Sequence, residues 1–209
     1  MSEYYEDKYN QSEFHWGKQP SSIARIFFQM FPPPASQTLI ELGCGEGRDA
    51  VFFARSGYQV TAFDYSVEGI HKAKAWAKDL DLNIDFFQAD INQFRLERSY
   101  DVVFSSGALH YIPQEKRKEI ITNYKHFTSP GGIHVHMVPI FKPFIPQNPL
   151  DDPLEQDWLS GEILTYYHDW KIEYFTEEVQ DDIFSDYKFP INRIIAREPS
   201  KLKINDFTP

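Results

Sequence analysis

The sequence predicts an α/β protein with a mostly parallel sheet, on three observations. Strand-like apolar runs alternate with helix-like runs from residue 38 to about 138, which is the order expected of parallel βαβ units. The chain has 209 residues, enough for one α/β domain with a well-buried sheet and too few for two. No internal repeat or low-complexity stretch interrupts the pattern. We therefore expect one domain, with helices on both faces of the sheet.

The first strand-like run leads into a glycine-rich turn. Residues 39–49 read Leu-Ile-Glu-Leu-Gly-Cys-Gly-Glu-Gly-Arg-Asp, with glycine at positions 43, 45 and 47. Glycine lets the backbone turn sharply and approach a ligand closely, and the start of the following helix offers unpaired N–H groups. The turn is therefore predicted to cradle a nucleotide.

Two charged residues favour a nucleoside that carries an amino acid over a dinucleotide. Dinucleotide-binding loops space their glycines as G-x-G-x-x-G, and Arg48 stands at the third position of that pattern. Glu41 would lie where a diphosphate needs positive potential, whereas a carboxylate can pair with the ammonium group of an amino acid. A nicotinamide-dependent oxidoreductase is the alternative that these two residues oppose.

Further motifs follow in a fixed order. A second strand-like run ends at Asp64, a third leads to Asp90, a fourth covers residues 100–106, and Pro130-Gly131-Gly132 precedes a fifth. In this order the motifs resemble those of the class I methyltransferases that use S-adenosylmethionine. The resemblance implies a Rossmann-like, seven-stranded, mostly parallel sheet with helices on both faces.

The resemblance also implies roles for individual residues. The acidic glycine loop would lie under the methionine part of S-adenosylmethionine, Asp64 would hold the ribose hydroxyls, and Asp90 would contact the adenine. The implied cofactor-binding residues are Glu41, Gly43, Cys44, Gly45, Gly47, Asp64, Tyr65, Asp90, Ile91 and Ser105. Cys44 is expected to pack within the loop and not to act as a nucleophile, because small buried cysteines mostly pack.

The two ends of the chain narrow the resemblance. Residues 4–9 and 13–17 are similar to the opening of methyltransferases of the tellurite-resistance and thiopurine type, and residues 164–174 are closer still to the tellurite-resistance group. That group carries a histidine and a following basic residue between its last two strands. Residues 178–186 contain acidic residues and no basic one, which weakens the case for an oxyanion acceptor.

The chain divides into four expected segments. Residues 1–37 form an N-terminal helical cap, 38–138 the cofactor-binding core, 139–198 a substrate loop with the C-terminal strands, and 199–209 a tail. Apolar periodicity and capping signals predict helices at 20–31, 66–80, 114–127 and 160–170, and late strands at 171–175 and 189–197.

The segment from Pro139 to Pro153 is expected to be an ordered loop that covers the substrate. Prolines at 139, 143, 146, 149 and 153 exclude an ordinary strand or helix. Large apolar side chains stand between them, which a disordered linker, the alternative, seldom carries. Long irregular connections often serve as lids or binding loops.

His110 is the candidate catalytic residue. It lies just beyond the fourth strand, at the carboxyl edge where open α/β sheets bind ligands, and there it would orient or deprotonate an acceptor. The alternative is that it caps the following turn. The candidate substrate residues are His15, Trp16, Tyr111, Phe141 and Phe144. For the first two, packing in the core is the alternative.

Two further clusters have structural interpretations. His134 and His136 share one face of a strand and could begin a metal site, but no third ligand has a matching spacing. We expect two hydrogen-bonded histidines and no metal. The run of charges at residues 115–119 is expected to be a solvated helix face.

The composition argues against two classes of binding partner. The chain holds 21 basic and 31 acidic residues, and the formal charge of -10 repels phosphate backbones and anionic membranes. We expect no nucleic-acid or membrane partner. The first seven residues are acidic, not a signal peptide, and no apolar run reaches membrane-spanning length. These features, with a single cysteine, predict a cytoplasmic protein.

The expected function is methyl transfer from S-adenosylmethionine to a small molecule with a soft nucleophile of the sulfur, selenium or tellurium type. The reaction is an in-line displacement in which geometry supplies most of the catalysis, and a soft anion hardly needs a general base. A non-catalytic sensor or assembly partner that binds S-adenosylmethionine is the alternative outside enzymes. The sequence predicts no oligomeric state.

Overall fold

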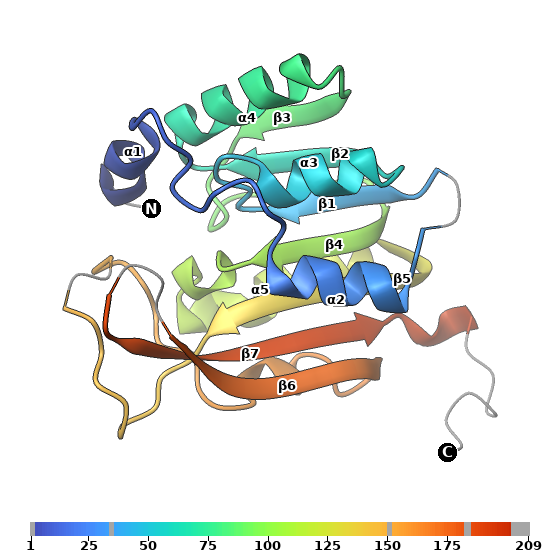
Figure 1. Ribbon diagram of the computed structural model, residues 1–209. Helices are drawn as coiled ribbons and strands as arrows, with labels where there is room; N and C mark the ends of the chain where they lie inside the picture. Colours follow the sequence, from blue (N-terminus) through green and yellow to red (C-terminus); the bar gives the residue numbers. More distant parts are fainter. Residues whose placement is uncertain (1–2, 34–35, 150–151, 182–184, 202–209) are drawn as a thin grey trace.

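A seven-stranded sheet forms the centre of the protein (Figure 1). The computed structural model describes residues 3–33, 36–149, 152–181 and 185–201. The strands are β1 (Thr38–Leu42), β2 (Gln59–Asp64), β3 (Ile84–Gln88), β4 (Tyr100–Ser106), β5 (Thr128–Pro139), β6 (Lys171–Asp181) and β7 (Lys188–Arg197). The helices are α1 (Glu3–Tyr9), α2 (Ser22–Met30), α3 (Arg48–Arg55), α4 (Val67–Asp79), α5 (Gln114–His126) and α6 (Glu162–Thr165), with 3-10 turns η1 (Leu109–Tyr111) and η2 (Pro199–Lys201).

The topology of the sheet creates a crevice at one edge. The strand order is β3-β2-β1-β4-β5-β7-β6, with β1 to β5 parallel and β7 antiparallel to both of its neighbours. The predicted seven-stranded, mostly parallel sheet is therefore confirmed. From β1 the chain continues to β2 and β3 on one side of the sheet, and from β4 it continues to β5 on the other side. The loops that leave β1 and β4 therefore diverge at the carboxyl ends of these strands. Ligands of open α/β sheets bind at such a point.

An apolar cluster on each face of the sheet holds the helices. On one face α2, α3 and α4 pack through buried side chains that include Phe27, Phe53 and Ala73. On the other face α5 contributes Ile121, and the segment after β5 contributes the fully buried Trp158. Figure 1 shows α2 and α3 in front of the sheet. Both faces are covered, as the sequence predicts.

Capping signals set the bounds of α4. The Ser66 hydroxyl accepts a hydrogen bond from the Gly69 N–H at 2.9 Å, which satisfies one free donor of the first turn. Ala73 and Ala77 lie on the buried face of this helix. Leu80 is its C-cap residue and is 41% exposed.

The helix expected at residues 160–170 is only one turn long, which corrects the sequence-based expectation. Gly161 has a left-handed φ of 68° immediately before α6. After α6 the fully buried Tyr167 bonds to His134 and His136 of β5. This tertiary contact takes the place of a second helical turn. In contrast, β6 is longer than expected, because its pairing with β7 continues to Asp181.

Arg117 was expected on a solvated helix face, and the structure shows that it is buried. Its side chain is 1% exposed and lies against the indole ring of Trp158, with 4.2 Å between the guanidinium carbon and the ring centroid. It donates to Ile112 O at 3.0 Å, to Asp157 O at 2.9 Å and to a Glu162 carboxylate oxygen at 2.7 Å. Arg117 therefore fastens the segment after β5 to α5.

Arg117→Met is expected to lower the free energy of unfolding by about 3 kcal/mol, because it removes the cationic partner of the Glu162 carboxylate and a donor to two backbone carbonyls. Chemical denaturation would measure the loss. Lys116→Met, one residue away on the exposed face of α5, is the matched control and should change stability by less than about 0.5 kcal/mol. Equal stabilities of the two variants would contradict a buried anchor.

Candidate functional site

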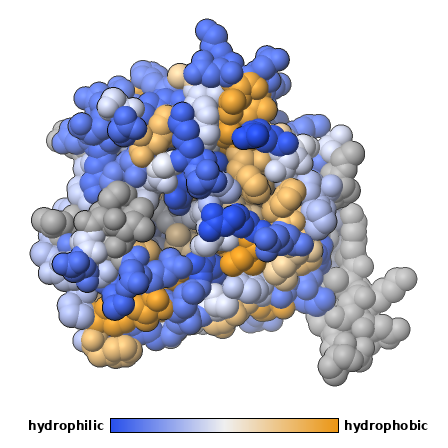
Figure 2. All heavy atoms as spheres, in the orientation of Figure 1, coloured by the Kyte–Doolittle hydropathy of each residue, from blue (hydrophilic) through white to orange (hydrophobic). Residues whose placement is uncertain are grey.

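A cavity of about 1030 Å³ opens at the crevice beside β1 and β4. Its walls come from α1, the glycine loop, η1, the loop after β5, and the ends of β6 and β7. Figure 2 shows that hydrophilic side chains predominate on this face of the molecule, with smaller apolar groups between them. The cavity is large enough for a cofactor and a small second molecule.

The glycine loop needs glycine for the sharp turn that the sequence suggests, and also because neighbouring side chains lie close to its backbone. Gly43, Gly45 and Gly47 all have positive φ, at 74°, 52° and 84°. A Cβ on Gly43 would lie 2.3 Å from the Cβ of Ala108, and one on Gly45 would lie 2.7 Å from the Tyr9 hydroxyl. Larger residues would therefore be strained and would also collide with the cavity wall.

Asp64 connects the glycine loop to α4. Its two carboxylate oxygens accept hydrogen bonds from the Gly45 N–H at 2.7 Å and the Ser66 N–H at 2.9 Å. Burial raises the pKa of Asp64, and these two hydrogen bonds oppose the rise. Each carboxylate oxygen has a further lone pair, so Asp64 can still accept from hydroxyl groups in the cavity. The sequence did not predict this structural role.

Glu41 presents an unsatisfied carboxylate oxygen to the cavity. The side chain is 2% exposed, and its Oε2 atom has no hydrogen-bond partner among the described residues. Burial raises the pKa of Glu41, and the nearby Asp49 and Asp64 raise it further, whereas Arg48 lowers it. A buried carboxylate in this state is stabilised by a cationic ligand. An ammonium group meets that requirement.

The N-terminal helix α1 closes one side of the cavity. The Glu6 carboxylate accepts hydrogen bonds from the N–H groups of Val67 and Glu68 and from the Ser66 hydroxyl, at 2.7, 3.2 and 3.0 Å. A carboxylate is favourable at a helix N-terminus, and this one fixes α1 to the start of α4. Tyr5 and Tyr9 consequently line the cavity.

Most of the predicted site residues lie at the cavity. Those that line it are Trp16, Glu41, Gly43, Cys44, Gly45, Asp64, His110, Tyr111 and Phe141. Those that do not line it are His15, Gly47, Tyr65, Asp90, Ile91, Ser105 and Phe144. Cys44 is buried in the loop, as expected. Trp16 donates from its indole nitrogen to the Tyr9 hydroxyl at 3.3 Å.

The structure gives other roles to several of the residues that lie away from the cavity. Ser105 is fully buried and donates to Leu42 O, whereas the next residue of β4, Ser106, faces the cavity because side chains alternate along a strand. The Asp90 carboxylate accepts from the Asn92 N–H and stabilises the turn after β3. Phe144 is 77% exposed.

Gly47, Ile91 and His15 also have local roles. Gly47 caps α3, and a Cβ there would lie 2.8 Å from the Cβ of Ala73 in α4. Ile91 is fully buried in the apolar core. His15 packs edge-on against Trp16, and burial lowers its pKa to about 4.

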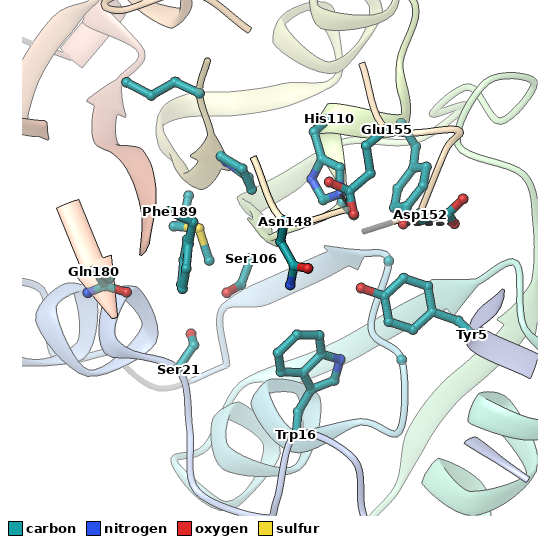
Figure 3. Close-up of a pocket in the computed structure, with 18 of the residues that line it drawn as sticks. Tyr5, Trp16, Ser21, Ser106, His110, Asn148, Asp152, Glu155, Gln180 and Phe189 are labelled. Atoms are coloured by element: carbon teal, nitrogen blue, oxygen red, sulfur yellow. Dashed lines mark hydrogen bonds and ion pairs between the residues drawn. The ribbon is translucent and has the colours of Figure 1, made fainter. Parts of the chain in front are cut away.

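Acidic and aromatic side chains gather at one end of the cavity. Figure 3 shows His110, Glu155, Asp152 and Tyr5 there, while Ser21, Gln180 and Phe189 lie at the other end. His110 is 4% exposed, its two ring nitrogens have no hydrogen-bond partner among the described residues, and its Nε2 lies 3.5 Å from Glu155 Oε1. The sequence did not single out the two acidic residues, because they lie more than 40 positions beyond His110 and no motif marks them.

His134 and His136 are hydrogen-bonded, as predicted. The Tyr167 hydroxyl lies 2.7 Å from His134 Nδ1 and 2.9 Å from His136 Nε2, and Thr128 Oγ1 lies 2.8 Å from His134 Nε2. Burial lowers the pKa of His134 well below its ordinary value and that of His136 to about 3. Across the described ranges, no group of three metal-ligating side chains is found.

The fold and the glycine loop define the class I methyltransferase architecture. A sequence model of the family described as "Tellurite resistance protein TehB" matches residues 1–196. The chain therefore belongs to the TehB family. Within the described part of the chain, no helix is long and apolar enough to cross a membrane.

Relatives and solved structures agree with this assignment. A "Probable S-adenosyl-L-methionine-dependent methyltransferase TehB" of Haemophilus influenzae is 26% identical over 177 residues, which are 85% of this chain and 58% of that protein. This chain thus spans less than two thirds of the relative's length. The crystal structure of TehB from Haemophilus influenzae superimposes with a TM-score of 0.74 at 24% identity, covering 94% of this chain and 66% of that one. A structure described as "Conversion of a Disulfide Bond into a Thioacetal Group during Echinomycin Biosynthesis" has a TM-score of 0.70 at 18% identity, with 99% and 95% of the chains covered.

The neutral histidine pair predicts a pH dependence of stability. The unfolded histidines take up protons below a pH of about 6.5, whereas the folded His136 does so only near the value of about 3, so stability falls as pH drops between these values. Each such histidine contributes about 1.4 kcal/mol per pH unit.

His136→Gln, whose amide can still reach the Tyr167 hydroxyl, should therefore show a shallower loss of stability between pH 6 and pH 4. Denaturant unfolding at several pH values would measure the slopes. The control is His71→Gln, because the His71 side chain is 65% exposed. Parallel slopes for wild type and His136→Gln would contradict a neutral buried pair.

Proposed function

We propose that this protein transfers the methyl group of S-adenosylmethionine to a small molecule whose nucleophilic atom is soft, of the sulfur, selenium or tellurium type. Its family and its relative's description support the donor. The family's description as a tellurite-resistance protein supports a soft acceptor atom. The cavity is large enough to hold donor and acceptor together.

The single observation that carries the donor is the unsatisfied oxygen of Glu41. S-adenosylmethionine bears an ammonium group on its methionine part, and Glu41 would receive that group beside the glycine loop. Asp64, 7% exposed at the end of β2, would accept from the ribose hydroxyls. Ala108 and Tyr9 occupy the positions toward which a Cβ on Gly43 or Gly45 would point, so the loop has no room for larger side chains there.

On the acceptor side the protein's contribution is position and proton removal. S-adenosylmethionine supplies a methyl group bound to a positively charged sulfur. The nucleophile of the acceptor takes this methyl group in line, and the sulfur is the leaving group. His110 has two unpartnered ring nitrogens at the cavity wall, so a neutral imidazole there can accept the proton of a thiol or selenol. Glu155 then stabilises the resulting imidazolium across 3.5 Å. Trp16 and Phe141 line the cavity and exclude water.

Glu41→Gln should have opposite effects on stability and on binding. Removal of a buried, unsatisfied charge should raise the stability of the ligand-free protein by roughly 1 kcal/mol. The same change should weaken binding of S-adenosylmethionine by about 1.5–3 kcal/mol, the range for a hydrogen bond to a charged group. Thermal unfolding and titration calorimetry would measure the two effects.

Glu46→Gln provides the comparison for stability. Glu46 is also buried but is paired with Lys72, so its neutralisation should destabilise the protein. If Glu41→Gln destabilised the protein equally and bound the cofactor normally, Glu41 would not be the ammonium site.

Turnover is tested with a panel of thiol, selenite, tellurite and amine acceptors, with mass spectrometry to detect methylated products. We expect methylation of at least one of the soft acceptors, and His110→Ala should lower the rate on thiols by about 10²-fold or more at neutral pH, the contribution of a general base. Cofactor binding without any methylated product would support the non-catalytic sensor instead. Absence of cofactor binding would contradict the proposed function.

A further inference from the structure

One end of the cavity combines negative charge with aromatic rings. We name it the acidic-aromatic end, and it consists of Tyr5, His110, Tyr111, Asp152 and Glu155. The Tyr111 hydroxyl donates to Asp152 Oδ2 at 3.2 Å, and the rings of His110 and Tyr111 are 4.4 Å apart. The Tyr5 ring stands edge-on to Tyr111, with 6.4 Å between centroids. Figure 3 shows Tyr5, His110, Asp152 and Glu155 grouped at this end of the cavity.

Two carboxylates, Asp152 and Glu155, lie at this end, and the ammonium group of Lys8, which also lines the cavity, lies 5.7 Å from the centroid of the Tyr5 ring. Burial raises the pKa of Tyr5 far above its usual range, and Glu155 raises it further. Glu155 makes no ion pair with a lysine or arginine among the described residues, and its side chain is 29% exposed. Several cations elsewhere on the cavity wall are neutralised locally. Lys142 pairs with Glu177, Lys188 with Asp181, and Arg48 with Asp49.

His110 supplies a second and independent indication of a ligand. It is 4% exposed, yet neither ring nitrogen has a hydrogen-bond partner in the described ranges. Buried polar groups are normally satisfied, so a side chain in this state at a cavity wall indicates a missing ligand group. A neutral imidazole nitrogen can accept a hydrogen bond from an N–H or S–H group, and it repels an anion only weakly. The carboxylates of Asp152 and Glu155 repel an anion strongly.

We propose that the acidic-aromatic end binds an ammonium group of the methyl acceptor. The acceptor is then a cationic small molecule, such as an amino thiol, in which the ammonium group lies a few bonds from the soft nucleophile. This inference rests on the proposed function and adds the charge of the substrate to it. Glu155 and Asp152 supply the counter-charge, and the faces of Tyr5 and Tyr111 supply cation–π attraction. An oxyanion at this end would be repelled by the carboxylates of Asp152 and Glu155.

Three thiols of similar size test the charge preference. They are 2-aminoethanethiol, which is cationic, 2-hydroxyethanethiol, which is neutral, and mercaptoacetate, which is anionic. Calorimetry on the protein saturated with S-adenosylhomocysteine, at neutral pH, measures binding without turnover. We expect the cationic thiol to bind about tenfold more tightly than the neutral one, and the anionic thiol to bind most weakly. Equal affinities, or a preference for mercaptoacetate, would overturn the inference.

Variants then locate the subsite. Glu155→Gln should reduce the preference for the cationic thiol over the neutral one by about fivefold or more, without changing the affinity for S-adenosylhomocysteine. Glu115→Gln is the matched control, because Glu115 is exposed on α5 and does not line the cavity. If both variants kept the preference, the ammonium group would not lie at Glu155 and the inference would fail.

Tyr5 provides a test that keeps the charge constant. Tyr5→Phe retains the aromatic face and should keep most of the preference, whereas Tyr5→Leu should lose it in part. Equal effects of Phe and Leu would contradict cation–π recognition. Saturation by S-adenosylhomocysteine is established first in each protein. Normal saturation without charge preference contradicts only this inference, whereas failure to bind S-adenosylhomocysteine contradicts the proposed function itself.

Discussion

The Asp64 carboxylate holds together the part of the structure on which the cavity depends. One of its oxygens accepts from the glycine loop and the other from the residue that caps α4. The same cap, Ser66, donates to Glu6 of α1, so a continuous set of hydrogen bonds links the loop, α4 and the N-terminal helix. Because α1 carries Tyr5 and Tyr9 to the cavity, the shape of the cavity wall at α1 depends on the Asp64 side chain at the end of β2. Substitution of Asp64 would therefore disturb the cavity wall as well as any ligand contact.

Local sequence patterns predicted the sheet, its parallel order and the glycine loop, because each depends on neighbours in the chain. Glycine conformations, the Ser66 cap and strand alternation are properties of a few consecutive residues. The failures have the opposite character. Arg117 is buried only because Trp158 and Glu162, more than 40 residues later, pack against α5. The helix at 160–170 is cut short by the bond from Tyr167 to two strand histidines. Contacts between distant segments leave no periodic signal in the sequence.

The predicted and unpredicted residues of the site differ in the same way. Glu41 and Gly45 were predicted from one glycine-rich loop and Asp64 from the family resemblance, and all three line the cavity at the crevice. The acidic-aromatic end draws on α1, η1 and the loop after β5, and the sequence gives no reason to group those segments. Ser105 and Ser106 illustrate a finer limit: the motif identifies the strand end, but only the pairing of β4 with β1 decides which serine faces the cavity.

The buried polar groups of β5 differ from those of the cavity wall in how many of their hydrogen bonds are made within the protein. On β5, His134 and His136 both bond to the Tyr167 hydroxyl, and burial lowers the pKa of both, so they complete the core, with only His136 Nδ1 lacking a partner among these described ring nitrogens. At the cavity, Glu41 and His110 are equally buried yet retain unsatisfied atoms. Leaving such atoms unpaired costs about 1–3 kcal/mol each, and a bound molecule recovers that cost where its own charge and donors match. Glu41 and His110 belong to different parts of the cavity wall, the start of the glycine loop and η1, which is the arrangement expected if two different molecules complete the site.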